Sequence, residues 1–254
     1  MQTLWSQCRA GWRLNRLVLH IVVGVVLTAF FAGLLRQSVN QVFFRRLITW
    51  WLRSVPRILG LQVKTVGQPA AGVLMVANHI SWLDIPLLGG ATNLRFLSKK
   101  EVRDWPVIGW LADHAGTLFI ERGKAGAAGE ASHTILQTLR TGHSVLLFPE
   151  GTTTTGDDLR TFHARLFAPA FEASVAVQPI AIRYPAANGL THPLVPYVGE
   201  QSLMSNLRGL LGENGLTAEI HFLPPISTEG LERKRVAAYC EQQIRAVIKP
   251  SDTA

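Results

Sequence analysis

The distribution of hydrophobic positions separates a long apolar segment near the start of the chain from everything that follows. Residues 17–35 contain no Asp, Glu, Lys or Arg, and His20 is the only ionisable side chain among them. A helix of this length would be about 29 Å long, close to the hydrocarbon thickness of a bilayer. The pattern therefore predicts a transmembrane helix over 17–35. A buried core helix and a cleaved signal peptide are the alternatives, although no clear cleavage site precedes Arg36.

The next segment, residues 39–60, mixes large apolar side chains with four arginines: Arg45, Arg46, Arg53 and Arg57. Aromatic rings beside guanidinium groups are typical of the headgroup layer of a membrane, and Trp50 and Trp51 supply the rings here. The pattern predicts an amphipathic helix at about 39–60. A helix packed on the folded domain with a solvated basic face fits the same pattern, and both descriptions can hold at once.

From residue 72 onward, short apolar runs alternate with stretches of helical periodicity. The expected strands are Val73–Ala77, Leu94–Ser98, Thr117–Glu121, Ser144–Phe148, Val175–Ile182 and Ala218–Leu223. The expected helices are Ser81–Leu88, Ala127–Thr141, Phe162–Ala173 and Leu231–Ile248. This alternation predicts an α/β fold in which a mixed β-sheet is layered with α-helices. We divide the chain into N-terminal membrane-binding helices, residues 1–66, and an α/β domain, residues 67–254.

Composition favours a membrane partner over the other partners of a basic protein. The net charge is +8, which fits nucleic acid, an anionic membrane surface or acidic substrates. Charged residues make up only 17% of the chain, and this low share favours the membrane. The two cysteines, Cys8 and Cys240, are far apart and form no metal-binding pattern. We expect free thiols in a reducing compartment, with one long-range disulfide as the alternative.

A histidine and an aspartate follow the first expected strand of the α/β domain. A carboxylate that holds one imidazole nitrogen leaves the other nitrogen free to take a proton, so His79 and Asp84 form a candidate acid/base pair. Five residues of extended chain span roughly 16 Å, and positions i and i+5 lie on different faces of a helix. The two side chains meet only if the chain turns sharply. Taken alone, the pair fits better as a loop histidine with a capping aspartate.

Two other strand ends carry polar groups. Arg122 follows an apolar strand, and a guanidinium group can bind a phosphate or a carboxylate through two parallel hydrogen bonds. Glu150, Gly151 and Thr152 follow another buried strand, which is broken by Pro149. Glu150 can orient a substrate hydroxyl or hold Arg122. The sequence has no acyl-serine motif, and no second histidine or cysteine near His79 has metal-ligand spacing, so we expect no metal site.

Four motifs follow one another along the chain: His79…Asp84, then Gly116-x-x-Phe119-Ile120-x-Arg122, then Phe148-Pro149-Glu150-Gly151-Thr152, then Val177-x-Pro179-Ile180. Over roughly residues 72–185 the chain thus resembles the lysophospholipid acyltransferase family, of the 1-acylglycerol-3-phosphate acyltransferase type. The resemblance implies an enzyme that moves a fatty acyl group from a thioester to a lysolipid hydroxyl. It implies that His79 is the general base, that Asp84 orients it, and that Arg122, Glu150, Gly151 and Thr152 bind the acceptor.

The same resemblance implies the partners and the place of action. The acyl donor would be acyl carrier protein or a coenzyme A thioester, with no further cofactor. The enzyme would lie at the inner membrane with its catalytic domain facing the cytoplasm, and no nucleic acid is expected. Thr153, Thr154 and Thr155 stand where many relatives have a basic residue. Lysophosphatidate is the first candidate acceptor and lyso-ornithine lipid the second. A non-catalytic basic protein that binds lipid or nucleic acid is the alternative of a different class.

Overall fold

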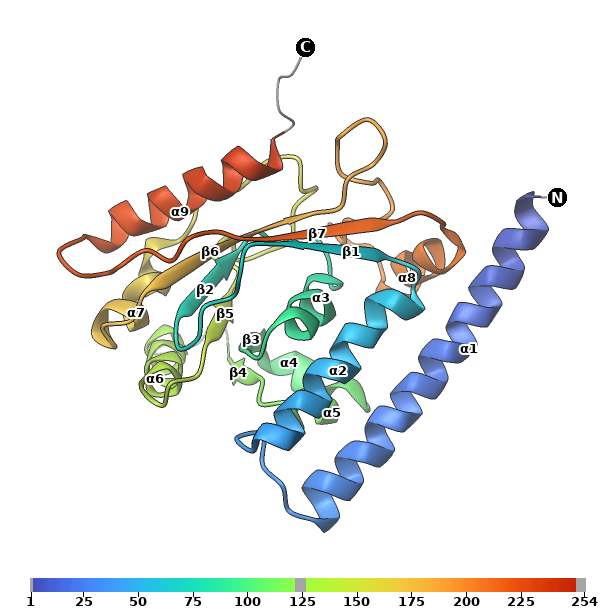
Figure 1. Ribbon diagram of the computed structural model, residues 1–254, viewed down its shortest axis with the longest axis horizontal. Coiled ribbons are helices and arrows are strands. Elements are labelled where there is room, and N and C mark those ends of the chain that lie inside the picture. The colour runs from blue at the N-terminus through green and yellow to red at the C-terminus, as the bar shows by residue number, and fades with distance from the viewer. Residues whose placement is uncertain (1, 122–126, 250–254) are drawn as a thin grey trace.

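A mixed β-sheet forms the centre of the computed structural model, which describes residues 2–121 and 127–249 (Figure 1). Its strands are β1 (Gln62–Val66), β2 (Leu74–Ala77), β3 (Arg95–Lys99), β4 (Leu118–Ile120), β5 (Val145–Leu147), β6 (Val177–Arg183) and β7 (Thr217–Phe222). Their order across the sheet is β1-β7-β6-β2-β5-β3-β4. The five strands from β6 to β4 are parallel, whereas β7 is antiparallel to β6 and β1 runs parallel to β7. The carboxyl ends of the five parallel strands therefore meet at one edge.

All six expected strands are confirmed within two residues at each end, but β1 was not predicted from the sequence. Every residue of β1 is exposed, the strand lies at the edge of the sheet, and its sequence, Gln-Val-Lys-Thr-Val, contains no continuous apolar run. A buried strand is recognised in the sequence by a continuous apolar run, as in β2, where four consecutive residues are buried. An exposed edge strand carries no such signal.

The helices cover both faces of the sheet (Figure 1). In chain order they are α1 (Gln2–Thr28), the π-helix η1 (Ala29–Leu34), α2 (Val42–Ile58), α3 (Asp84–Ala91), α4 (Lys100–Arg103), α5 (Ile108–His114), α6 (Ala127–Arg140), the 3₁₀ helix η2 (Ala164–Phe167), α7 (Ala168–Glu172), α8 (Leu203–Gly212) and α9 (Arg233–Ile248). The helix expected over Phe162–Ala173 is instead η2 followed by α7, and Pro169 stands in the first turn of α7. The short helices α4, α5 and α8 were not predicted.

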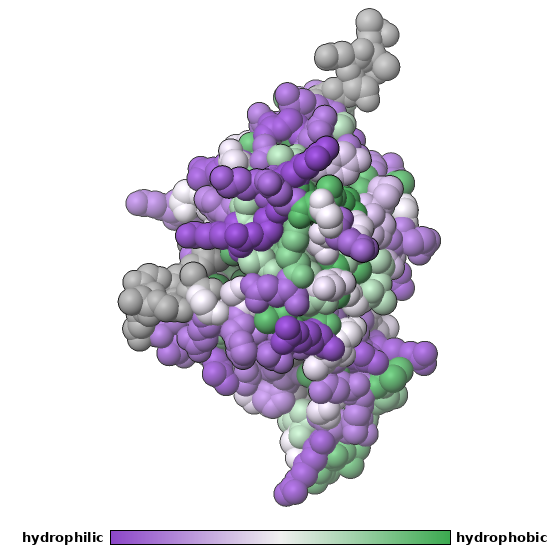
Figure 2. Space-filling view, turned by 90° about the vertical axis from the view of Figure 1, so that its left-hand side faces the viewer, coloured by the Kyte–Doolittle hydropathy of each residue, from purple (hydrophilic) through white to green (hydrophobic). Residues whose placement is uncertain are grey.

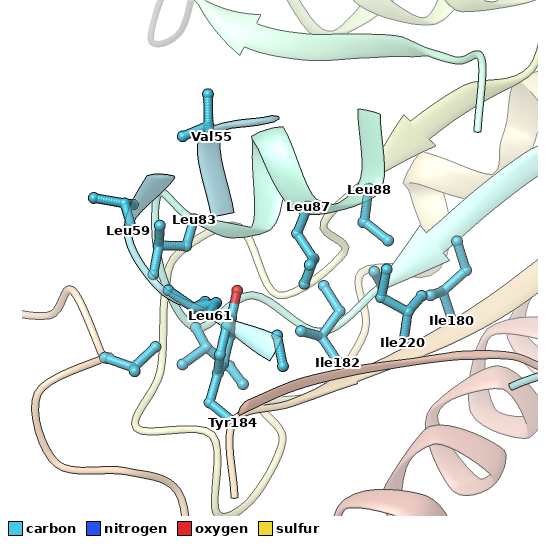
Figure 3. Packing of buried hydrophobic residues seen from close by; sticks show 14 of the residues in the cluster. Val55, Leu59, Leu61, Leu83, Leu87, Leu88, Ile180, Ile182, Tyr184 and Ile220 are labelled. Atoms are coloured by element: carbon cyan, nitrogen blue, oxygen red, sulfur yellow. The ribbon is translucent and has the colours of Figure 1, made fainter. Parts of the chain in front are cut away.

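Alternate residues of β2 contribute to two hydrophobic clusters, one on each side of the sheet. Met75 and Ala77 pack with residues of α2, α3 and α8. Leu74 and Val76 pack with residues of α6 and α9. Figure 3 shows the first cluster, in which side chains of α3 meet those of β6. Burial on both faces of β2 fixes the position of the residues that directly follow this strand.

The N-terminal segment is a helical hairpin: α1 and η1 form its first arm, and α2 returns beside them as the second arm (Figure 1). Trp51 donates its indole N–H to the carbonyl oxygen of His20 at 2.9 Å, and the two rings stack with centroids 4.8 Å apart. Leu4–Leu34 is long and apolar enough to cross a membrane, and few of its side chains are buried against the protein. This exposure is unlike that of a core helix, one of the alternatives for 17–35.

The start of α1 is attached to the α/β domain through two arginines. Arg9 donates to the carbonyl oxygen of Gly212 at 2.7 Å, and the buried Arg13 donates to that of Leu211 at 3.2 Å. These carbonyls belong to the end of α8, where the last backbone acceptors of a helix have no partners within the helix. The guanidinium groups satisfy these acceptors and also complement the negative end of the helix dipole.

Neither cysteine forms a disulfide, as the sequence led us to expect. Cys8 is exposed on α1, and Cys240 is buried in α9. Burial raises the pKa of the Cys240 thiol to about 12. This thiol is therefore protonated at neutral pH and behaves as a small apolar side chain.

The buried side chain of Asn78 ties the end of β2 to the end of β6. Its carbonyl oxygen accepts from the backbone N–H of Ile182 at 2.8 Å, and its amide donates to the carbonyl oxygen of Ile182 at 2.9 Å. Both bonds replace ladder hydrogen bonds at the point where the two strands separate. Asn78 thus sets the spacing between the chain segments that follow β2 and β6.

Replacing Asn78 by leucine should destabilise the protein, since two buried backbone groups of Ile182 lose their partners. We expect the free energy of unfolding to fall by about 2–5 kcal/mol, the cost of two unsatisfied groups. Denaturant unfolding in detergent, followed by circular dichroism, measures this change. Asn93→Leu, at an exposed position, is the matched control. A loss below about 1 kcal/mol for Asn78→Leu would contradict this role of Asn78.

Candidate active site

His79 and Asp84 meet at the carboxyl edge of the sheet. His79 lies two residues beyond β2, and Asp84 is the first residue of α3. The backbone N–H of Asp84 donates to the carbonyl oxygen of Ser81 at 3.1 Å, which closes the turn between strand and helix. The imidazole Nδ1 of His79 lies 2.7 Å from Oδ2 of Asp84. The sharp turn that the five-residue spacing requires is therefore present.

The Asp84 carboxylate is fully buried and is bound by four donors of the chain. Its Oδ2 accepts from His79 Nδ1 and from the backbone N–H groups of Ile80 at 2.8 Å and Ser81 at 3.0 Å. Its Oδ1 accepts from the hydroxyl of Tyr184 at 2.7 Å. A buried charge is stable only when it is paired and hydrogen-bonded, and the start of α3 adds a favourable helix dipole. These bonds fix the carboxylate in one orientation.

The bonds of Asp84 also decide which nitrogen of His79 carries the proton. A carboxylate only accepts hydrogen bonds, so Nδ1 of His79 is the protonated nitrogen and Nε2 carries the lone pair. Within residues 2–121 and 127–249, Nε2 has no hydrogen-bond partner. The imidazole side chain is 20% exposed, so Nε2 is accessible to a molecule that enters this edge. This geometry is that of a general base.

Other groups fix the ring and backbone of His79. Its ring stacks on Phe148, with centroids 3.9 Å apart and planes inclined by 14°. Its backbone N–H donates to Glu150 Oε1 at 2.9 Å, and its carbonyl oxygen accepts from the backbone N–H of Thr154 at 2.8 Å. The turn after β5 therefore holds the backbone of His79 on both sides, and Phe148 limits rotation of its ring.

Glu150 is buried, and each of its carboxylate oxygens accepts a hydrogen bond from a backbone N–H group. Oε1 accepts from His79, and Oε2 accepts from the N–H of Arg160 at 2.9 Å. Burial raises the pKa of Glu150, and the two N–H bonds, followed by the charges of His79 and Arg160, oppose this rise. Glu150 thus joins the loop that precedes Arg160 to the catalytic turn. Its expected contact with an acceptor stays a prediction.

The neighbours of Glu150 in the same motif are exposed at the edge of the site. Gly151 has a φ of 75°, a conformation that favours glycine, and its N–H closes a turn to the carbonyl oxygen of Phe148 at 3.0 Å. Thr152 follows and is exposed to solvent. The predicted contact of both residues with the acceptor stays a prediction.

Arg122 lies outside the described residues, so its predicted role as an acceptor-binding residue is untested. The glycine of the same motif has a clear structural reason. Gly116 has a φ of 78°, and a Cβ atom there would lie 1.9 Å from the guanidinium group of the buried Arg95. Arg95 donates to the carbonyl oxygen of Ala115 at 3.2 Å and to the side chain of Asn40 at 2.9 Å. Glycine is thus required where the chain enters β4.

The lysines and the arginine between the motifs are exposed on the surface. Lys100 lies 3.2 Å from Glu121, and Arg103 lies 3.3 Å from Asp113. Lys99 is exposed beside them at the end of β3. These side chains form a solvated face on which Lys100 and Arg103 are paired with carboxylates.

Two residues of the site were not identified as functional from the sequence. Phe148 was expected as the end of a strand and as the first residue of a motif, with no role in the site, and Tyr184 was not considered. Each is an aromatic residue at or just beyond the carboxyl end of a parallel strand that neighbours β2. An aromatic residue directly after such a strand was the feature of the sequence that could have identified both. Among the described residues, no group of three or more His, Cys, Asp or Glu side chains could hold a metal ion.

Comparison with known proteins places this site in a family. The model of the acyltransferase family matches residues 60–183. The chain is 47% identical over 206 residues to a lyso-ornithine lipid O-acyltransferase of Pseudomonas aeruginosa, over 80% of this chain and 79% of that protein. The chain belongs to the acyltransferase family. The resemblance that the four motifs carry and the enzyme class that it implies are thus confirmed.

Further members of the acyltransferase family support the assignment. The chain is 36% identical to a lyso-ornithine lipid O-acyltransferase of Brucella abortus, over 81% of this chain and 82% of that protein. It is 33% identical to a 1-acyl-sn-glycerol-3-phosphate acyltransferase of Neisseria gonorrhoeae, over 75% of each. The crystal structure of the 1-acyl-sn-glycerophosphate (LPA) acyltransferase PlsC of Thermotoga maritima superposes with a TM-score of 0.74 at 19% identity, covering 98% of this chain and 96% of that chain. This likeness confirms the predicted fold.

Replacing Glu150 by glutamine tests its part in this acyltransferase site. Glutamine offers one acceptor where the carboxylate offers two, so its amide group faces a backbone N–H of His79 or Arg160. A buried unpaired donor costs about 1–3 kcal/mol, and we expect kcat to fall about tenfold or more. Steady-state acyl transfer in detergent measures this change. Glu229→Gln, at an exposed position, is the control, and equal activity of the two variants would contradict this role.

Proposed function

We propose that this acyltransferase transfers a fatty acyl group from a thioester to the free hydroxyl of a lysolipid, and that lyso-ornithine lipid is its acceptor. The observation that carries the reaction is the contact of 2.7 Å between His79 and Asp84, which leaves Nε2 of His79 exposed as a base. The observation that carries the acceptor is the similarity of the chain to proteins named for that lipid.

The residues of the site supply a base and a stabilising charge for this reaction. Nε2 of His79 takes the proton of the acceptor hydroxyl while the oxygen of that hydroxyl attacks the carbonyl carbon of the thioester. A C–O bond forms, the C–S bond breaks, and the leaving thiolate takes the proton back from His79. Asp84 stabilises the imidazolium that exists between these two steps. A base placed in this way contributes roughly 10²–10⁴-fold to the rate.

The head group of the acceptor differs between the two candidates. Ornithine carries an amine and a carboxylate in place of the phosphate of lysophosphatidate, and this chain lacks a basic residue directly after Thr152. Thr153 and Thr154 bond inward, to the carbonyl oxygens of Tyr197 and His79. The motifs alone put lysophosphatidate first. The order reverses because identity is 47% and 36% to relatives named for lyso-ornithine lipid and 33% to one named for glycerophosphate.

The donor and the location belong to the same proposal. The donor is the thioester of acyl carrier protein or coenzyme A, and no other cofactor takes part. The enzyme lies at the cytoplasmic membrane with its catalytic domain in the cytoplasm, and residues 1–66 bind the membrane. The free thiols and the exposed apolar side chains of α1 support this location. In Figure 2, hydrophilic side chains cover much of the face around α6, α7 and α9, and hydrophobic surface is exposed at mid-height and again near the lower end.

A second exposed apolar group lies at the carboxyl edge of the sheet. Trp105, Val107, Ile108 and Trp110 are exposed around the start of α5, which packs against α1. Tryptophan is favoured at the interface between membrane and water, because its ring is apolar and its N–H is polar. These side chains lie beyond the end of β3, on the edge that carries His79. Their position supports an active site that opens at the membrane surface.

The function is tested by turnover of a panel of lysolipids with acyl thioester, using purified enzyme in detergent. We expect lyso-ornithine lipid to be acylated faster than lysophosphatidate. His79→Ala should lower kcat by about 10²–10⁴-fold, because the base is lost. His133→Ala, which removes an exposed histidine of α6, is the matched control.

Three results would overturn parts of this proposal. Wild-type turnover by His79→Ala would refute His79 as the base. Faster acylation of lysophosphatidate would refute the acceptor. No turnover with any lysolipid would refute acyl transfer to lysolipids and favour a non-catalytic binding protein.

Membrane insertion of α1 is tested with an environment-sensitive fluorophore on a cysteine at Leu19, which is 63% exposed. The variant carries Cys8→Ser, so that Cys240, which is buried, is the one other thiol. In vesicles, lipids with quenchers in the bilayer core should quench the probe strongly, since position 19 lies at the middle of the apolar segment Leu4–Leu34, which is long enough to cross a membrane. A probe at Glu229, an exposed residue between β7 and α9, should not be quenched. Equal quenching at both positions would contradict insertion.

A further inference from the structure

The side chain of Tyr184 crosses the hydrophobic core and contacts Asp84, the partner of His79. It is the first residue after β6, is 1% exposed, and lies among the apolar side chains between β6 and α3. Figure 3 shows its hydroxyl directed away from β6, towards the layer that contains α3. There the hydroxyl donates to Oδ1 of Asp84 at 2.7 Å, across 100 positions of sequence.

The two oxygens of Asp84 have different partners. Three donors converge on Oδ2, and one of them is the imidazole of His79. Within the described ranges, Tyr184 alone donates to Oδ1. A carboxylate held at one oxygen can rotate about its bond to Cβ, whereas bonds at both oxygens define its plane. Since the bond to His79 depends on the position of Oδ2, the orientation of the imidazole depends on what holds Oδ1.

We propose that Tyr184 is a positioning residue for acyl transfer: its hydroxyl holds Asp84, and Asp84 thereby holds the imidazole of His79 with Nε2 facing the substrates. The proposal rests on the acyl transfer proposed above and adds to it a residue that lies outside the four motifs. Tyr184 itself touches neither the base nitrogen nor the acceptor.

The hydroxyl of Tyr184 has no role in packing. A phenylalanine would fill the same space, and a buried hydroxyl is unfavourable unless it makes a hydrogen bond. The bond to a charged oxygen provides that compensation and is stronger than a bond between neutral groups. Burial, together with the adjacent Asp84, holds the pKa of the Tyr184 phenol well above its ordinary value. The phenol therefore keeps its proton and stays a donor at neutral pH.

Tyr184→Phe separates the hydroxyl from the packing. We expect kcat to fall about tenfold, with KM for donor and acceptor changed less than about twofold, because the substrates do not contact this residue. The acid limb of the pH profile of kcat/KM should move to higher pH. Without the phenol, the negative charge of Asp84 is no longer shared with a hydrogen-bond donor and stabilises the protonated form of the imidazole more, although the carboxylate is less well oriented. Tyr239→Phe is the matched control, since Tyr239 is 47% exposed on α9.

A purely structural role predicts a different result. A loosened core would lower the melting temperature and raise KM, and the acid limb would stay in place. Tyr184 is not a positioning residue if the acid limb of Tyr184→Phe coincides with that of the wild type, whatever the change in kcat. The positioning role is also refuted if kcat of Tyr184→Phe stays within about twofold of the wild-type value, because loss of a charge-assisted hydrogen bond should have a larger effect.

A spectroscopic measurement separates this proposal from the proposed function. In the wild type, the proton on Nδ1 of His79 is held by Asp84 and should give a slowly exchanging NMR signal. In Tyr184→Phe this signal should broaden or shift, and in Tyr239→Phe it should not. If the wild type acylates no lysolipid, the function is wrong, and the NMR signal still decides the role of Tyr184. An unchanged signal in Tyr184→Phe would overturn the proposal.

Discussion

The buried carboxylate of Asp84 is the constraint on which the rest of the site depends. A charge in the core is stable only if donors surround it, and here all four come from the chain itself. Two are backbone N–H groups of the turn after β2, one is the imidazole, and one arrives from β6. Each donor requires a specific neighbouring element. The turn, the start of α3 and the end of β6 must therefore be in place together before the carboxylate can be buried.

The strand order satisfies this requirement. β2 lies between β6 and β5, and the three strands are parallel, so their carboxyl ends lie side by side. His79 follows the central strand. Tyr184 follows one neighbour and acts on Asp84, and the turn around Glu150 follows the other and holds the backbone of His79. Segments distant in sequence thus reach one histidine because crossover connections place their strands next to each other.

The sequence predicts what is local and apolar. Buried strands show as continuous runs, and the end of each run marks where polar groups gather, which located His79, Asp84 and Glu150. The spacing of His79 and Asp84 showed that a contact between them required a sharp turn, and the resemblance carried by the four motifs predicted that contact. Tyr184 was missed because its contact spans 100 positions and depends on strand order, which no local pattern contains. The edge strand β1 was missed because exposure removes the apolar signal.

The bonds of the dyad also indicate where acceptor choice must be made. The hydrogen bonds of Asp84, and those of His79 at Nδ1 and along its backbone, are made within the chain, which leaves Nε2 for the substrate. In the proposed reaction Nε2 takes its proton from the acceptor hydroxyl, and this hydroxyl is the same chemical group whichever head group the acceptor carries. In the proposed reaction, discrimination between an ornithine and a phosphate head group therefore falls to residues other than His79 and Asp84. A site with this division can keep one mechanism for acceptors with different head groups.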